Sequence, residues 1–225
     1  MHKKIGFVLL ALTTILSFAS AVAPPPAKEI LESVRLRQAQ QELDLQGQLR
    51  EGATIVPFRL TQTGPLIRYT FSNPNEALQL RLSDNDSRLE EVTREGVEKI
   101  MPAQFDHKVR DTGVTYEDLA LKFLYWPNAR VMGDDSIQLQ DCWKLELKAP
   151  NRQSQYSNVR LWVAKDAGAL MKLEGYDWSG KLAKRFTVVS GQKIEGRWFL
   201  KQMRIEEFDT STGKVRTRTY LEIKK

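Results

Sequence analysis

The sequence predicts a mainly β fold of the α+β type, in which a strongly curved antiparallel sheet of about eleven strands forms an unclosed half-barrel with helices over its concave side. Long stretches after residue 42 alternate apolar and polar residues, a pattern typical of strands with one buried face. Short turn sequences separate these stretches, which favours antiparallel neighbours. Because strand twist accumulates, one sheet of that size must curl.

Composition supports one globular domain over residues 29–225. The chain has 225 residues, of which 41% are hydrophobic and 28% charged, enough apolar material to exclude a disordered protein. The formal charge is +6, and it falls to +4 without residues 1–21, which hold two lysines and no acids. A mildly basic exported protein is attracted to anionic membrane surfaces or acidic partners. Nucleic acid is not an expected partner, because basic and acidic residues are interleaved along the chain.

The first residues have the pattern of a secretory signal peptide. Lys3 and Lys4 precede an apolar run over residues 5–18, and the small residues 19–21 offer a cleavage site near Ala21. The apolar run of about 14 residues is shorter than the roughly 20 that a membrane span requires. No cysteine lies at the cleavage point to carry a lipid, so we expect a periplasmic protein without a lipid anchor. Residues 22–28 are predicted to be a proline-rich linker.

The first helix is expected over residues 29–41, where Ile30, Leu31 and Val34 have helical spacing. After this helix, apolar residues recur at every second position. Strands are predicted over residues 43–49, 56–60, 66–72 and 78–82, and a turn followed by a charged strand over residues 84–95.

A second helix is expected over residues 115–127. Thr115 and Asp118 have the spacing of a capping pair, and Pro127 ends the helical pattern. A broad apolar face needs an apolar surface to cover, and the concave side of the sheet offers one. That face consists of Tyr116, Leu119, Ala120, Phe123 and Leu124.

The chain returns to strands after this helix, with turn sequences such as Ser179-Gly180 between them. The predicted strands are residues 141–148, 157–164, 169–178, 181–190, 194–208 and 214–224.

The residues that could support catalysis or bind a metal occur without the partners such chemistry needs. Ser179 lacks a G-x-S-x-G context and is interpreted as a turn residue. His107 is the one histidine after residue 21, so a surface role is preferred to a metal site. Cys142 is the single cysteine, which excludes an intramolecular disulfide, and no histidine lies near it in sequence to activate the thiol. We therefore predict no enzyme, no cofactor and no metal, although a carboxylate pair of the glycosidase type stays open.

Residues 84–95, DNDSRLEEVTRE, imitate a calcium-binding loop. Asp84, Asp86 and Glu95 stand at the first, third and twelfth places of such a loop. However, Leu89 takes the place where the sharp turn needs glycine, and Arg88 puts a cation at a ligand position. A calcium site is therefore not predicted.

The C-terminal half resembles the outer-membrane lipoprotein-sorting proteins, the LolA-like group. The resemblance spans roughly residues 110–225. It rests on W-x-L-x-L from Trp143, L-W-V from Leu161, D-x-x-G-K from Asp177, G-R-W from Gly196, T-G-K from Thr212 and Y-E-D-L from Tyr116. These motifs are structural, so they indicate the fold more specifically than the task.

The resemblance implies a periplasmic protein that binds acyl chains of a lipid or lipoprotein in an apolar concavity and carries them towards the outer membrane. It also implies partners, namely membrane-bound proteins that load and receive the cargo, and we expect a monomer. The cavity and its helical lid are predicted to be lined by Tyr116, Leu119, Phe123, Leu124, Trp143, Leu145, Leu147, Leu161, Val163, Phe186 and Val188.

A second function stays open, in which the same scaffold is an envelope protein-binding or stress-sensing module. The alternating charges Arg216, Arg218, Glu222 and Lys224 on the last strand motivate it. Each predicted cavity residue could equally be ordinary core, and the charges could be a solvated sheet face.

Overall fold

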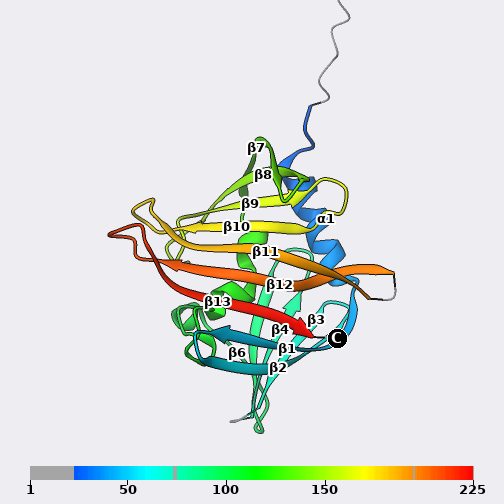
Figure 1. Ribbon diagram of the computed structural model, residues 1–225, viewed down its shortest axis with the longest axis vertical. Coiled ribbons are helices and arrows are strands. Elements are labelled where there is room, and N and C mark those ends of the chain that lie inside the picture. Colours follow the sequence, from blue (N-terminus) through cyan, green and yellow to red (C-terminus); the bar gives the residue numbers. More distant parts are fainter. Residues whose placement is uncertain (1–22, 73–74, 195, 225) are drawn as a thin grey trace, which may run out of the picture.

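The protein forms one antiparallel sheet of thirteen strands that does not close into a barrel, as the sequence predicts (Figure 1). The computed structural model describes residues 23–72, 75–194 and 196–224, so the expected signal peptide, residues 1–21, lies outside the described residues. The strand order is β6-β5-β4-β3-β2-β1-β13-β12-β11-β10-β9-β8-β7, so β6 and β7 are the two edges.

The strands follow one another as hairpins in two runs. The first run is β1 (Glu42–Glu51), β2 (Thr54–Thr63), β3 (Leu66–Phe71), β4 (Glu76–Leu82), β5 (Ser87–Val92) and β6 (Val97–Lys99). The second run is β7 (Asn128–Ile137), β8 (Gln140–Lys148), β9 (Asn158–Ala164), β10 (Leu170–Tyr176), β11 (Leu182–Ile194), β12 (Arg197–Phe208) and β13 (Val215–Lys224).

Two strands exceed the predicted number, and both lie at edges. β7 was missed because the turn after it has no glycine or asparagine, the usual residues for a left-handed turn. Instead, Gln138 and Leu139 both adopt positive φ, 52° and 65°. β6 has three residues, all exposed, so no alternation marks it.

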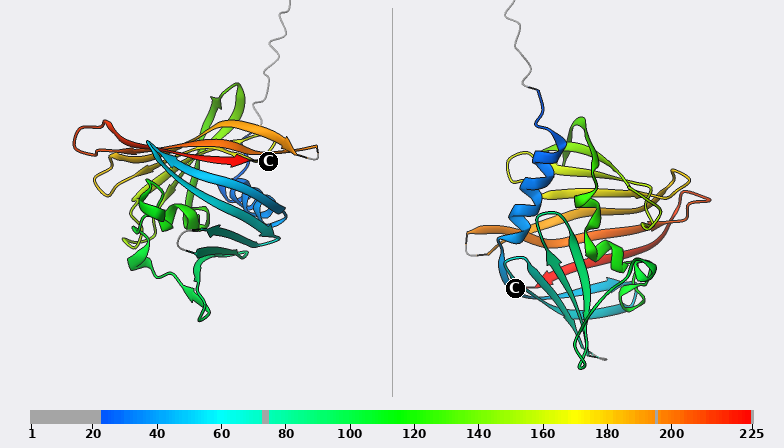
Figure 2. Two further views of the ribbon diagram at one scale, coloured as in Figure 1. Left: turned by 60° about the horizontal axis from the view of Figure 1, so that its bottom comes forward. Right: turned by 180° about the vertical axis from the view of Figure 1, so that it is seen from behind.

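The helices lie together on one side of the sheet (Figure 2). α1 (Ala27–Ala39) begins two residues before the predicted helix and therefore includes the end of the predicted linker. The predicted second helix is broken: α2 (Tyr116–Ala120) ends at Leu121, whose φ of 52° is left-handed, and the 3₁₀ turn η3 (Lys122–Tyr125) follows. Two further turns, η1 (Pro102–Gln104) and η2 (Val109–Asp111), precede α2. We call residues 101–126 the lid segment.

Two hydrophobic cores lie between the sheet and these helices. The first core fills the concavity of β1 to β5 and includes Phe58, Phe71 and Leu80. The second core lies under α1 and η3 on β8 to β10 and includes Leu145 and Leu161. Leu121 and Phe186 pack against both cores, so the lid segment bridges the two halves of the sheet.

The pairing of the first strand with the last joins the two runs of hairpins. β1 and β13 are antiparallel, from the pair Gln46–Lys224 to the pair Glu51–Thr219. Glu222 reinforces this junction, because its carboxylate accepts hydrogen bonds from Gln48 Nε2 at 2.6 Å and from Arg50 Nη2 at 2.7 Å. Gln202 Nε2 of β12 donates to the same carboxylate at 3.0 Å. Chiefly because of the bond from Arg50, the pKa of Glu222 falls from its usual 4.5 to about 2.

Replacing Glu222→Gln should lower the free energy of unfolding by about 1 kcal/mol at neutral pH. A lowered folded-state pKa stabilises the protein above the usual value of 4.5, and that stabilisation disappears as the pH falls through about 2. The difference between wild type and variant should therefore be constant above pH 4.5 and vanish in strong acid. Urea unfolding across this pH range measures it. Glu98→Gln on the exposed strand β6 is the control, and an equal pH-dependent difference there would contradict the assignment.

Candidate functional site

Six of the predicted cavity residues belong to the second core. Leu145, Leu147, Leu161 and Val163 project from β8 and β9 to the concave side, and Phe123 and Leu124 of η3 pack against them. Leu145, Leu147 and Leu161 have no exposed surface, because α1 buries Ile30, Leu31 and Val34 in the same cluster. In this closed arrangement, an acyl chain can reach these strands only if α1 or η3 moves away.

The other five predicted residues lie apart from this core or at its border. Tyr116 and Leu119 of α2 pack against the first core. Trp143 is half-buried, with Lys165 Nζ 3.9 Å from its ring centroid. Phe186 and Val188 of β11 are also half-buried, and Phe186 packs against both cores. The structure therefore does not bring the predicted site residues into one cluster.

A strip of half-buried apolar residues crosses β11 to β13 beside the first core. Val188 pairs with Met203 of β12, and Met203 pairs with Leu221 of β13. We call Phe186, Val188, Met203 and Leu221 the central strip. Met203 and Leu221 were not among the predicted cavity residues, although both stand at alternating apolar positions of predicted strands. Apolar side chains that keep some exposure on a concave face are the residues that a hydrocarbon ligand can contact first.

A buried ion pair fixes the lid segment to the sheet. Lys184 Nζ of β11 lies 2.7 Å from Asp118 Oδ2 of α2, and the two side chains are 5% and 2% exposed. The Tyr156 hydroxyl donates to Asp118 Oδ1 at 2.7 Å, and the Thr115 amide donates to Oδ2 at 2.8 Å. The predicted capping pair of Thr115 and Asp118 is confirmed. We call Asp118, Lys184 and Tyr156 the polar anchor.

Gly175 makes room for the polar anchor. A Cβ at Gly175 would lie 2.5 Å from Cε1 of Tyr156, so only glycine lets this ring lie flat on β10. Burial raises the pKa of the Tyr156 hydroxyl well above its usual value, which keeps the hydroxyl protonated as a donor to Asp118.

Glu117 holds the same end of α2 against the loop before β9. Its carboxylate accepts hydrogen bonds from the Ser154 hydroxyl and from the Gln155 amide, the latter at 2.8 Å. Burial raises the pKa of Glu117 above its usual value. The charged form is therefore costly in the closed position and is compensated by these donors.

The lid segment has a second attachment at the β1–β13 junction. The Gly113 amide donates to Glu51 Oε2 at 2.7 Å and to Thr219 Oγ1 at 3.1 Å. A Cβ at Gly113 would lie 2.8 Å from Thr219 Oγ1, so a side chain would displace this loop. Together with the polar anchor, this contact fixes the lid segment at one end of the concave face. The central strip therefore has these polar attachments on one side and apolar core residues on the other.

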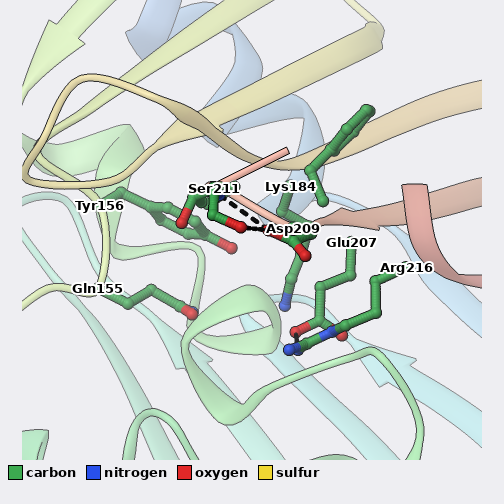
Figure 3. A pocket seen from close by; sticks show the side chains of 10 residues that line it. Gln155, Tyr156, Lys184, Glu207, Asp209, Ser211 and Arg216 are labelled. Carbon is green, nitrogen blue, oxygen red and sulfur yellow. Dashed lines mark hydrogen bonds and ion pairs between the residues drawn. The ribbon is translucent and has the colours of Figure 1, made fainter. Parts of the chain in front are cut away.

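A pocket of about 410 Å³ opens beside the polar anchor (Figure 3). Its charged side chains are already paired within the chain, because Arg216 contacts Glu207 and Lys184 contacts Asp118. Asp209 Oδ1 accepts a hydrogen bond from the backbone amide of Ser211 at 2.8 Å, within the β12–β13 turn. The pocket is therefore a polar rim of the concavity, and its walls are not apolar enough for an acyl chain.

The residues considered for catalysis or metal binding lie in a turn, on the surface or in the interior of the sheet. Ser179 lies in the predicted turn, and its hydroxyl donates to Asp177 Oδ1 at 2.7 Å. His107 is exposed, with its ring centroid 6.0 Å from that of Tyr116. Cys142 is a free, buried cysteine beside Trp162 and Ala164, and burial raises the pKa of its thiol, which makes the thiol unreactive. β5 occupies part of the calcium-like stretch, and Leu89 is buried in the first core.

The described residues, 23–72, 75–194 and 196–224, contain neither a metal-binding cluster nor a membrane-spanning helix. No group of three or more His, Cys, Asp and Glu side chains there could hold a metal ion. None of the helices in these ranges combines the length and the apolar character that crossing a membrane requires.

Solved structures share this fold. An outer membrane lipoprotein-sorting protein domain from Vibrio parahaemolyticus is similar at 16% identity and a TM-score of 0.68, over 88% of this chain and 90% of that one. A LolA superfamily protein from Nitrosomonas europaea is similar at 20% identity and a TM-score of 0.65, over 90% and 93%. A DUF1329 family protein from Desulfovibrio piger is similar at 19% identity and a TM-score of 0.65, over 89% and 92%.

These similarities define the class: the chain has the LolA-like fold of lipoprotein-sorting domains, and the resemblance noted in the sequence is confirmed. Residues 93–225 match the model of a family described as "Uncharacterized protein", and because the match covers more than half of the chain, the chain belongs to that family. A search of curated proteins finds no match.

Replacing Lys184→Met should destabilise the protein by about 3 kcal/mol or more, because Asp118 would remain buried without its cation. Adding Asp118→Asn should restore much of this loss, since the amide oxygen can still accept while no charge remains buried. Urea unfolding measures both effects. Lys108→Met is the control, because Lys108 is exposed and 3.7 Å from Glu207 and should cost less than about 1 kcal/mol. Equal effects at Lys184 and Lys108 would contradict the role of the polar anchor.

Proposed function

We propose that the protein is a non-enzymatic periplasmic carrier that binds the acyl chains of a lipid or lipoprotein between its lid and the concave face of its sheet. The observation that carries the proposal is the central strip, where apolar side chains keep some exposure on a concave face that helices cover. The fold is that of proteins described as lipoprotein-sorting. The polar rim at the end of the concavity suits a head group, while the central strip suits hydrocarbon.

Binding in this proposal requires the lid to move. The four buried cavity residues predicted on β8 and β9 are covered by α1 and η3, so an acyl chain enters along the central strip and displaces α1 and η3. Arg35 Nη1 of α1 donates to the Leu124 carbonyl at 2.7 Å, so α1 and η3 move together. The attachments at Asp118 and Gly113 lie in the middle of the lid segment, at one end of the concave face, and act as the hinge side.

The proposed place of action is the periplasm. The apolar run over residues 5–18 and the small residues before Val22 support export with cleavage near Ala21, and the proline-rich residues that follow connect the cleavage site to the domain. Membrane-bound loading and receiving proteins are the partners that a soluble carrier of this kind needs.

The alternative, an envelope protein-binding module, has less support. Three of the four charges of the last strand that motivated it take part in cross-strand pairs: Arg218 with Glu206, Glu222 with Arg50, and Arg216 with Glu207. Their alternation is explained by the pairing of β13 with its neighbours, so it does not by itself indicate a protein partner.

Delipidated protein should bind a fluorescent fatty acid saturably, and protein purified from an exporting host should carry lipid detectable by mass spectrometry. Val188→Glu should lower this affinity at least tenfold, because a carboxylate in the central strip is costly to bury beside hydrocarbon. Titration by fluorescence measures the affinity.

Thr187→Glu is the matched control for this variant. Thr187 is the preceding residue of β11 and faces the opposite side of the sheet, between Lys172 and Arg204, where a carboxylate is tolerated. If the wild-type protein shows no saturable uptake of the fatty acid, the carrier function is refuted. If both variants lose affinity equally, the fatty acid does not bind at the central strip.

A further inference from the structure

In the described part of the chain, no helix lies over the face of β7 to β13 that is opposite α1 and the lid segment. Figure 1 looks onto this face, and the right view of Figure 2 shows the helices on the other side. Its side chains alternate along each strand with the buried ones, so strand register decides which outward residues become neighbours.

One row of this outward face alternates in charge. Register places four arginines and three glutamates directly opposite one another across seven strands, and each glutamate lies between two arginines. We call this set the alternating row. From β7 to β13 it is Arg130, Glu146, Arg160, Glu174, Arg185, Glu206 and Arg218.

The adjacent row contains cations and aromatic rings without a carboxylate. We call it the cationic row. Its cations stand on every second strand, which spaces them by about 10 Å, since neighbouring strands are about 4.8 Å apart. From β8 through β13 to β1 it is Lys144, Trp162, Lys172, Thr187, Arg204, Tyr220 and Arg50.

Aromatic rings hold the two lysines of the cationic row in place. The Trp162 ring, which is 3% exposed, lies between strands β8 and β10, with Lys172 Nζ 4.2 Å and Lys144 Nζ 5.1 Å from its centroid. The Arg50 guanidinium is 4.5 Å from the Tyr220 centroid. An aromatic ring carries no net charge, so these contacts position the cations without themselves neutralising them.

The carboxylates of this face lie beneath the cations. Glu174 contacts both Lys172 and Arg185 at 2.9 Å, and Glu206 contacts Arg218 at 2.9 Å and Arg204 at 3.6 Å. The glutamate side chains are 8% and 6% exposed, whereas Arg204 and Arg218 are 40% and 57% exposed.

Glu146 is likewise shared, by Arg130 at 2.6 Å and Arg160 at 3.6 Å. Two further carboxylates touch the cationic row: Asp135 accepts from Trp162 Nε1 at 2.8 Å, and Glu222 pairs with Arg50 at 2.7 Å. The two rows together hold eight cations, and the carboxylates that contact these rows number five, so the face keeps a net excess of three positive charges that solvent meets.

We propose that this outward face of β7 to β13 docks the protein onto the surface of an anionic phospholipid bilayer. An extended row of cations at about 10 Å intervals on an uncovered sheet fits an extended array of phosphates better than one small anion. The attraction is long-ranged and screened by salt. Docking in this way keeps α1 and the lid segment clear of the bilayer, and it does not depend on what the concave face carries.

The test is co-sedimentation of the purified protein with vesicles of equimolar phosphatidylglycerol and phosphatidylcholine, and with vesicles of phosphatidylcholine alone. We expect binding to the anionic vesicles that weakens as salt is added, and weak binding to the neutral ones. The triple variant Lys144→Gln, Lys172→Gln, Arg204→Gln should lose affinity for the anionic vesicles by about a hundredfold, since each cation near an anionic surface contributes roughly fivefold. In this variant Glu174 and Glu206 still form their ion pairs with Arg185 and Arg218, so the sheet should stay folded. Circular dichroism and thermal unfolding verify the fold.

The matched control is Lys28→Gln, Lys181→Gln, Lys214→Gln, which removes the same charge from α1 and two hairpin turns. It should keep affinity within a few-fold of wild type. Equal losses in the two triple variants would overturn the assignment to this face. Binding to both kinds of vesicle that does not depend on salt would also overturn the proposal, because it would show that the protein binds the acyl chains and not the anionic head groups. If the protein is retained on an immobilised acidic protein but does not bind vesicles, the partner of this face is a protein and not a membrane, which would overturn the proposal.

Discussion

The pairing of β1 with β13 is the constraint on which the rest of this structure depends. It joins two runs of hairpins, one from each half of the sequence, into a single sheet. Glu222 binds donors from β1 and β12 at this junction, so its charge connects three strands. Without the junction, each run would have two edges, and neither would curl far enough to enclose the lid segment.

Because the sheet is continuous, its two faces have different chemistry over their whole extent. The concave face holds two apolar cores and the central strip, under helices that the polar anchor fixes. The opposite face carries rows of side chains that cross β7 to β13 in register, with carboxylates beneath cations. Inward packing and outward charge are therefore two consequences of the same strand register.

Sequence patterns predicted the parts of the fold that depend on local alternation. Leu145, Leu147, Leu161 and Val163 face the concave side of the sheet, as their alternation predicts, and Ser179 lies in a turn as expected. The prediction was less accurate where local preference conflicts with tertiary packing. Residues 115–127 have a helical pattern, yet Leu121 adopts a left-handed conformation that lets α2 pack on one core and η3 on the other. β7 was missed because Gln138 and Leu139 form a turn that their residue types do not favour.

The sequence by itself determined the fold class, the absence of a disulfide, the alternation that buries one face of each strand, and the resemblance to lipoprotein-sorting proteins. These features depend on residue types at short spacings, which a linear pattern contains. Only the tertiary structure decided that Lys184 lies against Asp118, that Met203 and Leu221 border the concavity, and that Lys144, Lys172 and Arg204 stand in one row. Those contacts join residues far apart in the chain, and their positions are fixed by strand register and sheet curvature, which act over the whole sheet.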